Sequence, residues 1–393
     1  MKRIEILDSL RGFALLLILL YHSLYNFGAV YPGEETFLAF PGLDALSTSF
    51  IFHFVADRAF AVFSVIFGIS FFIQLNKRSE SEKFSVFFIR RLIALLIIGY
   101  LHSLLFRGDI LMKYAVIGLL LLPLNYLKNK ILTIISVILL IQIPDIYMLL
   151  QSELGQTAQY LNGNDPVWEE IISVSREGAF HELLMLNMWT GIKEVWIAYI
   201  NTGRLLFITG FFVIGLLIGR RFITGDFKIN RFFMVRIFFI SSALYVALGV
   251  LSNKLSLFSL NSADSYEILY NLLRKYMSVC MTFALITFFV IIYQFPLIKR
   301  KMDYLIPYGR MGLTTYLTQS LIGVPFFYGF GLAMYNYSAP FFSILVGMAI
   351  FTVQMIFSHL WFRHYAYGPA EWVWRSITYP DRKIPFKIKK SNP

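Results

Sequence analysis

Long apolar stretches recur along the 393-residue chain, and short segments rich in Lys and Arg separate many of them. A run of about 20 mostly apolar residues is long enough to cross the hydrocarbon core of a bilayer as a helix. The pattern therefore predicts an all-α fold, a polytopic transmembrane helical bundle of about ten spans. The predicted spans are residues 12–30, 52–74, 89–106, 112–127, 131–150, 203–219, 234–251, 276–295, 311–335 and 339–362.

The regular succession of spans predicts one transmembrane domain over residues 1–393. Its longest predicted outer segment is an amphipathic loop at residues 151–202, where three tryptophans lie between Trp168 and Trp196. Tryptophan is enriched at membrane interfaces, so this loop is either a lid that lies on the membrane or an entrance for a substrate. Residues 363–393 are predicted to form a basic cytoplasmic tail.

Composition supports a lipid environment. Hydrophobic residues make up 58% of the chain and charged residues only 15%, whereas soluble domains carry about 25% charged residues. The lipid bilayer is therefore the expected partner. The sequence leaves the formation of an oligomer open.

The net charge of +12 raises the question of a nucleic-acid partner. With the ten spans above and a cytoplasmic N-terminus, 26 of the 35 Lys and Arg residues lie on cytoplasmic segments and 9 on outer ones, while acidic residues divide 8 and 15. Basic residues orient membrane proteins by remaining in the cytoplasm. This distribution explains the positive charge without nucleic acid and predicts that both termini are cytoplasmic.

Ionisable residues inside apolar spans are costly and often functional. Asp8, Arg11 and His22 fall on one stripe of the first span, because residues eleven positions apart return to nearly the same helix face. Histidine changes charge near neutral pH, so His22 is a candidate general base. The alternative is a structural hydrogen bond between helices. The single cysteine, Cys280, gives no Cys-based metal site, and no metal is expected.

The third span repeats the same spacing, with Arg91 eleven residues before His102. The turn that follows holds Arg107 and Asp109, which predict either an ion pair that closes a hairpin or the polar lip of a tunnel. Two further polar positions are Arg58, which follows Asp57 early in the second span, and Gln319, in a ninth span that is unusually polar and is expected to face the bundle interior.

Five segments carry a resemblance to a known family: RIEILDSLRGFALLLILL, AFAVFSVIFGISFFIQL, RRLIALLIIGYLHSLLFRGDILMKYAVIGLLLL, GRMGLTTYLTQSLIG and YGPAEWVWRSITY. Through them the sequence resembles the YeiB-like bacterial inner-membrane proteins, catalogued as a domain of unknown function. In order and spacing the resemblance covers nearly the whole chain apart from the long outer loop. It implies a location in the bacterial cytoplasmic membrane.

The YeiB-like family is in turn similar to the transmembrane acyltransferases, namely the acyltransferase-3 enzymes and the heparan glucosaminide acetyltransferase. That similarity implies their fold, cytoplasmic acyl-CoA such as acetyl-CoA as donor, and a histidine within the membrane that assists acyl transfer. Asp8, Leu10, Arg11 and Gly12 match the D-x-L-R-G opening of those enzymes. His22 stands where the acyltransferase-3 enzymes place their histidine.

The leading hypothesis is therefore acyl transfer to a small-molecule or glycan acceptor at the outer face. We expect His22 and Asp8 to be catalytic, and Arg11 with Arg90 or Arg91 to bind the donor phosphates. The residues expected to contact the acceptor are His102, Arg107, Asp109, Arg58 and Gln319. Two alternatives stay open at this point: a transporter or transport-associated protein, and a structural or scaffold protein.

Overall fold

The computed structural model describes residues 4–27, 39–76, 84–155, 166–223, 230–379 and 383–388. All secondary-structure elements of these residues are helices, apart from one isolated antiparallel bridge between Tyr365 and Lys387. The all-α prediction is confirmed for this part of the chain.

The α-helices in the first part of the chain are α1 (Glu5–Tyr21), α2 (Pro41–Phe50), α3 (Arg58–Asn76), α4 (Phe84–Leu105), α5 (Leu111–Gly118), α6 (Leu121–Leu124), α7 (Asn129–Ile141), α8 (Ile143–Glu153), α9 (Pro166–Glu177) and α10 (Phe180–Leu186). The later ones are α11 (Ile192–Asn201), α12 (Arg204–Ile223), α13 (Arg231–Asn253), α14 (Ala263–Ile292), α15 (Pro296–Met302), α16 (Leu305–Arg310), α17 (Gly312–Phe327), α18 (Pro340–Trp361) and α19 (Pro369–Thr378). Three π-helical turns are η1 (His22–Asn26), η2 (Ile51–Val55) and η3 (Asn187–Gly191), and two 3-10 turns are η4 (Leu255–Leu257) and η5 (Met334–Asn336).

Six helical stretches of the described residues are long and apolar enough to cross a membrane, namely Glu5–Tyr25, Pro41–Asn76, Phe84–Leu105, Arg231–Asn253, Ala263–Ile292 and Pro340–Trp361. The number rises to eight if the bent pairs α7 with α8, and α10 and α11 with α12, each count as one span. The chain therefore has the helices of a membrane protein. The predicted number of ten spans is not confirmed.

The two predicted spans without a counterpart are residues 112–127 and 311–335. The first is divided between α5 and α6, and the second contains only the 16 residues of α17. A 16-residue helix is about 24 Å long, less than the roughly 30 Å of a hydrocarbon core. Apolar composition alone therefore does not establish that these two segments cross. Residues 28–30 of the first predicted span, 156–165 of the outer loop, and 380–382 and 389–393 of the tail lie outside the described residues.

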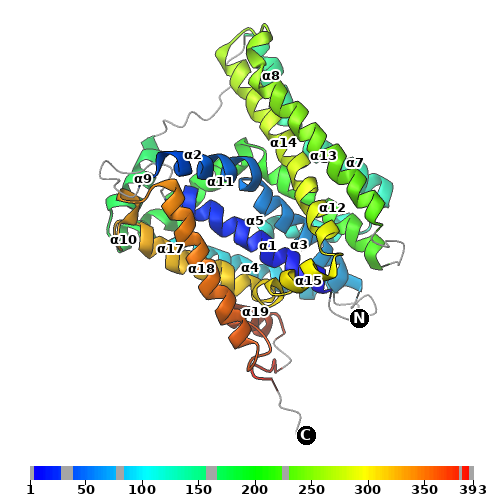
Figure 1. Ribbon diagram of the computed structural model, residues 1–393, viewed down its shortest axis with the longest axis vertical. Coiled ribbons are helices and arrows are strands. Elements are labelled where there is room, and N and C mark those ends of the chain that lie inside the picture. Colours follow the sequence, from blue (N-terminus) through cyan, green and yellow to red (C-terminus); the bar gives the residue numbers. More distant parts are fainter. Residues whose placement is uncertain are drawn as a thin grey trace.

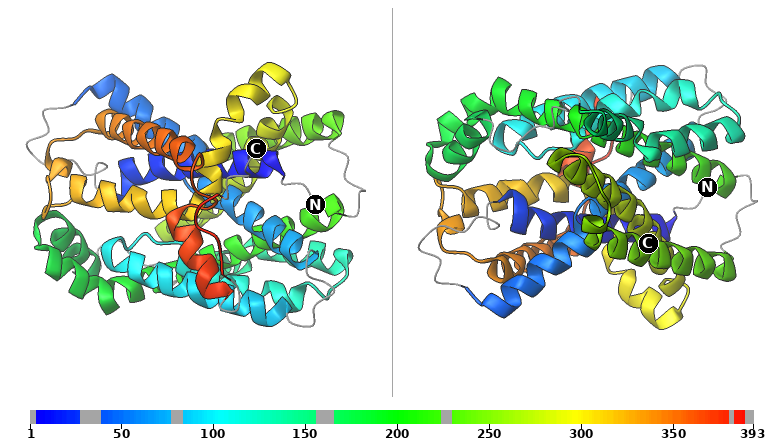
Figure 2. Two further views of the ribbon diagram at one scale, coloured as in Figure 1. Left: turned by 90° about the horizontal axis from the view of Figure 1, so that it is seen from below. Right: turned by 90° about the horizontal axis from the view of Figure 1, so that it is seen from above.

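Helix α1 lies in the middle of the bundle, where it contacts α3, α16, α17 and α18 (Figure 2). Its approach to α16 depends on glycine. A Cβ atom at Gly309 would lie 1.9 Å from the Asp8 carbonyl oxygen, and one at Gly12 would lie 2.6 Å from the Leu305 carbonyl oxygen. Close helix contacts in membranes commonly use such small residues. Gly12 therefore fixes the position of α1 against α16.

Helices α7, α8, α13 and α14 form the part of the molecule that extends toward the top in Figure 1. Helix α13 packs against α14, and most of its remaining surface is exposed and apolar, including Phe239 at 64% and Val246 at 61% exposure. Exposed apolar side chains in such number are stable only in contact with another apolar phase. This surface fits lipid.

The two ends of α1 lie among different elements. At its start, Ser9 Oγ donates to the Met302 carbonyl at 2.7 Å, and Trp374 Nε1 of α19 donates to the Arg91 carbonyl of α4 at 2.8 Å. Helices α15, α16 and α19 therefore gather near this end, which we call the α19 end. The other end leads into η1, near α2, α9 and α11 (Figure 1), and we call it the α9 end.

Candidate functional site

Two cavities lie along α1, each with a volume of about 430 Å³. The α19 cavity is lined from the start of α1, with Ile4, Asp8 and Arg11, and the α9 cavity from its other end, with Tyr21 and His22. Both cavities are lined by Ile18, Ile110 and Tyr316. These three side chains form a common wall between the two cavities. Volumes of this size are typical of small-ligand sites.

The α19 cavity is positively charged. Its described lining contains four arginines and two carboxyl groups, namely Arg11, Arg91, Arg310 and Arg375 against Asp8 and Glu371. Arg11 Nη1 donates to Asp8 Oδ1 at 2.7 Å, and its Nη2 donates to Ser70 Oγ at 3.2 Å. The Arg91 guanidinium stacks over the Trp374 ring, with Cζ 3.5 Å from the ring centroid. An arginine-rich cavity of this kind can bind an anion such as a phosphate.

Glu371 connects α19 to the start of α17. Its carboxyl accepts hydrogen bonds from the Leu313 amide at 2.6 Å, the Thr314 amide at 3.1 Å and the Thr314 hydroxyl at 2.6 Å. Burial raises the pKa of the Glu371 carboxyl above its ordinary value, although these hydrogen bonds act in the opposite direction. Glu371 therefore caps α17, the helix that carries Tyr316 to the wall.

The α9 cavity is rich in aromatic side chains. Six tyrosines line it, namely Tyr21, Tyr25, Tyr199, Tyr316, Tyr328 and Tyr335, together with Trp168. An ion pair between Asp57 and Arg204 also lines this cavity. Asp57 lies between η2 and α3 with a φ of 62°, a left-handed conformation that Asp adopts more readily than most residues. The cavity therefore combines ring faces with charged and hydroxyl groups.

The outer loop forms part of the α9 cavity. Ser175 and Ile172 of α9 and Ala198 of α11 belong to its lining. Arg107 Nη1 binds α9 through two hydrogen bonds, one to Ser175 Oγ at 2.8 Å and one to the Ile171 carbonyl at 3.2 Å. Arg107 and Asp109 therefore do not form the predicted ion pair. Arg107 binds Ser175, and Asp109 binds His102 instead. The loop covers the cavity, which suits either a lid or an entrance.

His22 and His102 lie beside the wall. His22 is the first residue of η1, and such π-helical turns often occur at functional sites. Its ring centroid is 4.9 Å from that of Phe106 and 6.2 Å from that of Tyr316, while His102 lies 5.8 Å and 5.2 Å from the same two rings. Two atoms, His22 Nδ1 and His102 Nε2, are buried without a hydrogen-bond partner among the described residues.

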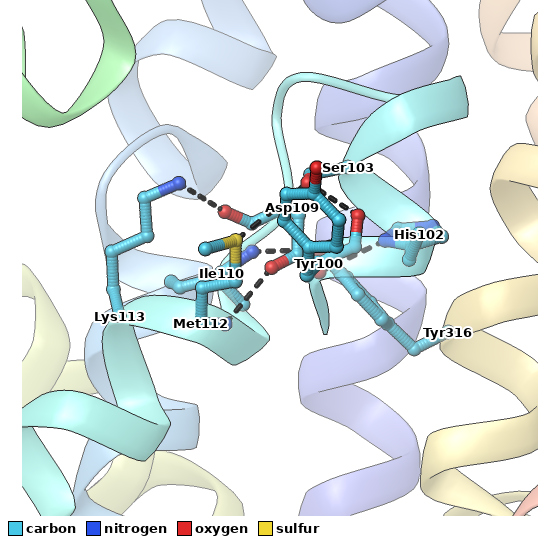
Figure 3. Close-up of polar contacts among 8 residues, drawn as sticks. All are labelled: Tyr100, His102, Ser103, Asp109, Ile110, Met112, Lys113 and Tyr316. Carbon is cyan, nitrogen blue, oxygen red and sulfur yellow. Dashed lines mark hydrogen bonds and ion pairs between the residues drawn. The ribbon is translucent and has the colours of Figure 1, made fainter. Parts of the chain in front are cut away.

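Figure 3 shows the polar contacts around His102. Its Nδ1 lies 2.9 Å from Asp109 Oδ1, and Asp109 Oδ2 accepts a hydrogen bond from the Met112 amide at 2.9 Å. Lys113 Nζ donates to the Asp109 carbonyl at 2.8 Å. The Tyr316 hydroxyl accepts a hydrogen bond from the Ile110 amide at 3.1 Å, which joins two of the three wall residues. His102 therefore belongs to a compact buried network.

The structure divides the predicted site residues into four groups. Asp8, Arg11 and Arg91 line the α19 cavity, and His22 and Arg107 line the α9 cavity. His102 and Asp109 pair beside the wall. The described lining of neither cavity includes Arg90, Arg58 or Gln319.

These last three residues have other surroundings. Arg90 is exposed. Arg58 Nη1 donates to the carbonyls of Ala56 at 2.5 Å and Phe52 at 3.1 Å. Gln319 Nε2 donates to the Leu15 carbonyl at 3.2 Å and the Tyr308 hydroxyl at 3.0 Å, so it links α17 to α1 and α16. The polar face of the ninth predicted span does point inward, as predicted.

Sequence reasoning missed four site residues: Tyr316 as a wall residue, Arg204, Arg310 and Arg375. Tyr316 lies in the polar run of α17, which was a usable signal. The three arginines carry no local signal, because each reaches a cavity through contacts between distant helices. Among the described residues, no group of three or more His, Cys, Asp or Glu side chains could hold a metal ion.

Comparisons with known proteins agree with the resemblance in the sequence. Residues 218–381 match a family model described as "Protein of unknown function (DUF418)". The chain is 27% identical to the uncharacterized protein YxaH of Bacillus subtilis (strain 168), over 96% of this chain and 94% of the relative. It is 28% identical to an uncharacterized 39.9 kDa protein of the amylase 3' region of Bacillus acidopullulyticus, over 99% and 97% of the two chains.

A further relative is the uncharacterized protein YeiB of Escherichia coli (strain K12), which is 26% identical over 96% of this chain and 97% of the relative. No solved structure matches the chain. None of these names describes an acyltransferase, so the implied acyltransferase fold and activity stay predictions. The family match and the similarity over nearly the whole chain confirm that this protein resembles the YeiB-like family of unknown function.

Proposed function

We propose that the protein is a membrane-embedded acyltransferase that moves an acyl group, such as acetyl, from cytoplasmic acyl-CoA to a hydroxyl or amine acceptor at the outer face. The observation that carries this proposal is the pair of cavities that meet at the wall of Ile18, Ile110 and Tyr316, beside His22. A donor in one cavity and an acceptor in the other could approach each other only at this wall.

The α19 cavity suits the donor. Coenzyme A carries phosphates, and the four arginines of this cavity exceed its two carboxyl groups. Arg11 and Arg91 would bind phosphate, and Asp8 would hold Arg11 in position through the 2.7 Å ion pair. Apolar lining residues such as Ile66 and Phe67 suit the uncharged arm that carries the thioester. Arg90 has no place in this scheme, because its side chain is exposed.

The α9 cavity suits the acceptor. Tyrosine and tryptophan rings beside a few charged groups are suited to a small polar molecule or a sugar. His22 lines this cavity, where a ring nitrogen could take the proton of an acceptor hydroxyl or amine. The acceptor oxygen or nitrogen then bonds to the acyl carbon, the carbon–sulfur bond breaks, and the proton passes to the CoA sulfur.

The proposed orientation rests on charge. The start of α1, and α15, α16 and α19, belong to segments that the distribution of Lys and Arg predicts to be cytoplasmic. These elements surround the α19 end. Acyl-CoA in the cytoplasm would therefore meet the arginine-rich cavity.

The first test is binding. Purified protein in detergent is heated with and without saturating CoA, and a ligand that binds the folded state raises the unfolding temperature. We expect stabilisation by CoA, and loss of most of it in Arg91→Gln. Arg90→Gln is the matched control, because Arg90 is the neighbouring residue on the helix and its side chain is exposed. Absence of any CoA effect on the unaltered protein would contradict the donor site.

The second test is transfer. The protein is incubated with acetyl-CoA labelled in the acetyl group and with extracted bacterial envelope glycans and lipids as acceptors. We expect covalent label in the extract, and at least a hundredfold less with His22→Ala. Unchanged transfer with that variant would overturn the role of His22.

One observation favours a second candidate function. Two cavities on opposite sides of a thin wall are also compatible with a transporter or a transport-associated protein. A transporter would move a compound across sealed vesicles unchanged, whereas an acyltransferase attaches the label covalently. The transfer test therefore separates the two functions.

A further inference from the structure

The proposed function uses His22 but assigns no chemical role to the buried pair of His102 and Asp109. Asp109 is fully buried, and both of its carboxyl oxygens are occupied, Oδ1 by His102 Nδ1 and Oδ2 by the Met112 amide. Met112 is in the first turn of α5, so its amide would otherwise be unpaired within the helix. The carboxyl group is thus fixed by α5 and can in turn fix the His102 ring (Figure 3).

The charges nearby indicate which protonation state His102 adopts. A buried carboxylate needs a compensating positive charge. Lys113 supplies one, because its side chain is buried in the same turn and its Nζ lies 2.8 Å from the Asp109 carbonyl. With Asp109 negative and Lys113 positive, a protonated His102 would add an unbalanced buried charge. A neutral His102 keeps the charges of this turn balanced.

The hydrogen bond to Asp109 then selects the tautomer. A carboxylate can only accept, so the proton of the neutral ring lies on Nδ1 and Nε2 keeps its lone pair. This Nε2 is buried and has no partner among the described residues. A buried acceptor left unpaired destabilises the folded state. A donor is therefore expected to reach it during the working cycle.

His22 is the best candidate for that donor. Its Nδ1 is also buried without a partner among the described residues, and both histidine rings pack against Phe106 and Tyr316. A hydrogen bond between these two unpaired nitrogens would satisfy both of them. If Nδ1 of His22 carries the proton and faces His102, its Nε2 keeps a lone pair for the acceptor in the α9 cavity.

We propose that Asp109, His102 and His22 form a proton relay beside the wall. In this relay His102 Nε2 accepts a hydrogen bond from His22 Nδ1–H and transiently takes that proton. The relay rests on the proposed function. His22 Nε2 takes the acceptor proton while His22 Nδ1 gives its own proton to His102. When the carbon–sulfur bond breaks, His102 returns its proton to His22 Nδ1, and His22 Nε2 passes the acceptor proton to the CoA sulfur.

In this scheme His22 contacts the reacting atoms, whereas His102 and Asp109 are positioning residues. They hold His22 in one tautomer, and the positive charge that arises when His22 takes the acceptor proton moves onto His102, beside the Asp109 carboxylate. The same logic operates in hydrolases whose catalytic histidine is oriented by a buried carboxylate. Here a second histidine lies between the carboxylate and the base.

The first measurement needs no substrate. Protein labelled with ¹⁵N-histidine in detergent micelles is examined by long-range ¹H–¹⁵N correlation, with signals assigned from His22→Phe and His102→Phe. We expect His102 and His22 to be neutral near pH 7, each with its proton on Nδ1. In His102→Phe, His22 should become a mixture of tautomers. A proton on His102 Nε2, or a His22 signal unaffected by His102→Phe, would overturn the relay.

The second measurement is acetyl transfer to the envelope extract. We expect His102→Phe and Asp109→Asn each to lower kcat at least tenfold while KM for acetyl-CoA changes less than twofold. His53→Phe is the control, because His53 is exposed near the α9 end. Asp109→Asn keeps the size of the side chain, so its kcat tests the relay if His102→Phe does not fold.

Different results would contradict the acyl transfer and the histidine relay. If the unaltered protein transfers no acetyl group, the proposed function is wrong, and the histidine spectra alone decide on the hydrogen bond from His22 to His102. If the unaltered protein is active and His102→Phe or Asp109→Asn keeps kcat within twofold, the relay is wrong and acyl transfer stands.

Discussion

The contact between α1 and α16 predicts that Gly309→Ala damages the protein. The added Cβ would lie 1.9 Å from the Asp8 carbonyl oxygen and 2.7 Å from the Gly12 amide nitrogen. Ordinary van der Waals contact begins at 3.4 Å, so the first distance must grow by 1.5 Å. Both contacts are with backbone atoms, which cannot rotate away as a side chain can. The two helices must therefore separate.

The size of the effect follows from the cost of overpacking, which is about 1–3 kcal/mol when one methyl group is forced into a packed interior. The displaced segment carries Asp8 and Arg11 on one side and Arg310 on the other, and all three line the α19 cavity. We therefore expect Gly309→Ala to lower the unfolding temperature by several degrees and to weaken stabilisation by CoA.

The assay is thermal unfolding in a single detergent, followed by tryptophan fluorescence, with and without CoA. Gly249→Ala in α13 is the matched control, since its Cβ would meet only the Met277 methyl at 3.4 Å. Alanine in a helix interior is favoured over glycine by up to about 1 kcal/mol, so this variant should be at least as stable as the unaltered protein. Equal unfolding temperatures for the two variants would refute the close approach of α1 and α16.

Two further predictions concern contacts between distant helices. Trp374→Leu removes the hydrogen bond to the Arg91 carbonyl and the stacking on the Arg91 guanidinium, together worth about 1.5–3 kcal/mol, so it should lower both the unfolding temperature and the CoA effect. Trp189 is 75% exposed, so Trp189→Leu should lower neither, and a similar loss in both variants would argue against the stacked arrangement. Lys275→Met leaves the buried Asp145 without its cation, 2.7 Å and 2.8 Å away, and should destabilise the fold by about 3–5 kcal/mol in thermal unfolding. Adding Asp145→Asn should recover part of that loss, and no recovery would count against the ion pair.

Helical periodicity was sufficient to place Asp8, Arg11 and His22 on one face of the first span. It could not show that this face passes from one cavity to the other, because the wall also needs Ile110 and Tyr316 from distant parts of the chain. The three residues of the predicted stripe lie in different cavities. Asp8 and Arg11 are in the α19 cavity, and His22 is in the α9 cavity.

Neighbouring residues on α4 illustrate a second limit. From the sequence alone, either Arg90 or Arg91 could belong to the donor site, because their side chains point only about 100° apart around the helix. The contact with Trp374, 283 residues away, distinguishes them and places Arg91 in the α19 cavity. No local pattern reports such a contact.

The turn after α4 shows the same limit at short range. Arg107 and Asp109 are close in sequence and opposite in charge, which predicts an ion pair. Instead Asp109 binds His102, and Arg107 reaches Ser175 on α9. The outer loop supplies that partner, and its folded position could not be predicted from hydropathy. The number of ten spans is not confirmed for a related reason, since hydropathy does not register where a helix ends, and α5 and α17 end before the predicted spans do.

The most direct test of acyl transfer between the two cavities uses sealed vesicles that contain the purified protein in a known orientation. Acetyl-CoA labelled in its acetyl group is supplied only on the side of the α19 end, and envelope glycans and lipids are enclosed on the other. We expect covalent label on the enclosed acceptors with the unaltered protein and almost none with His22→Ala. Absence of covalent label with the unaltered protein, or equal label with both proteins, would contradict it.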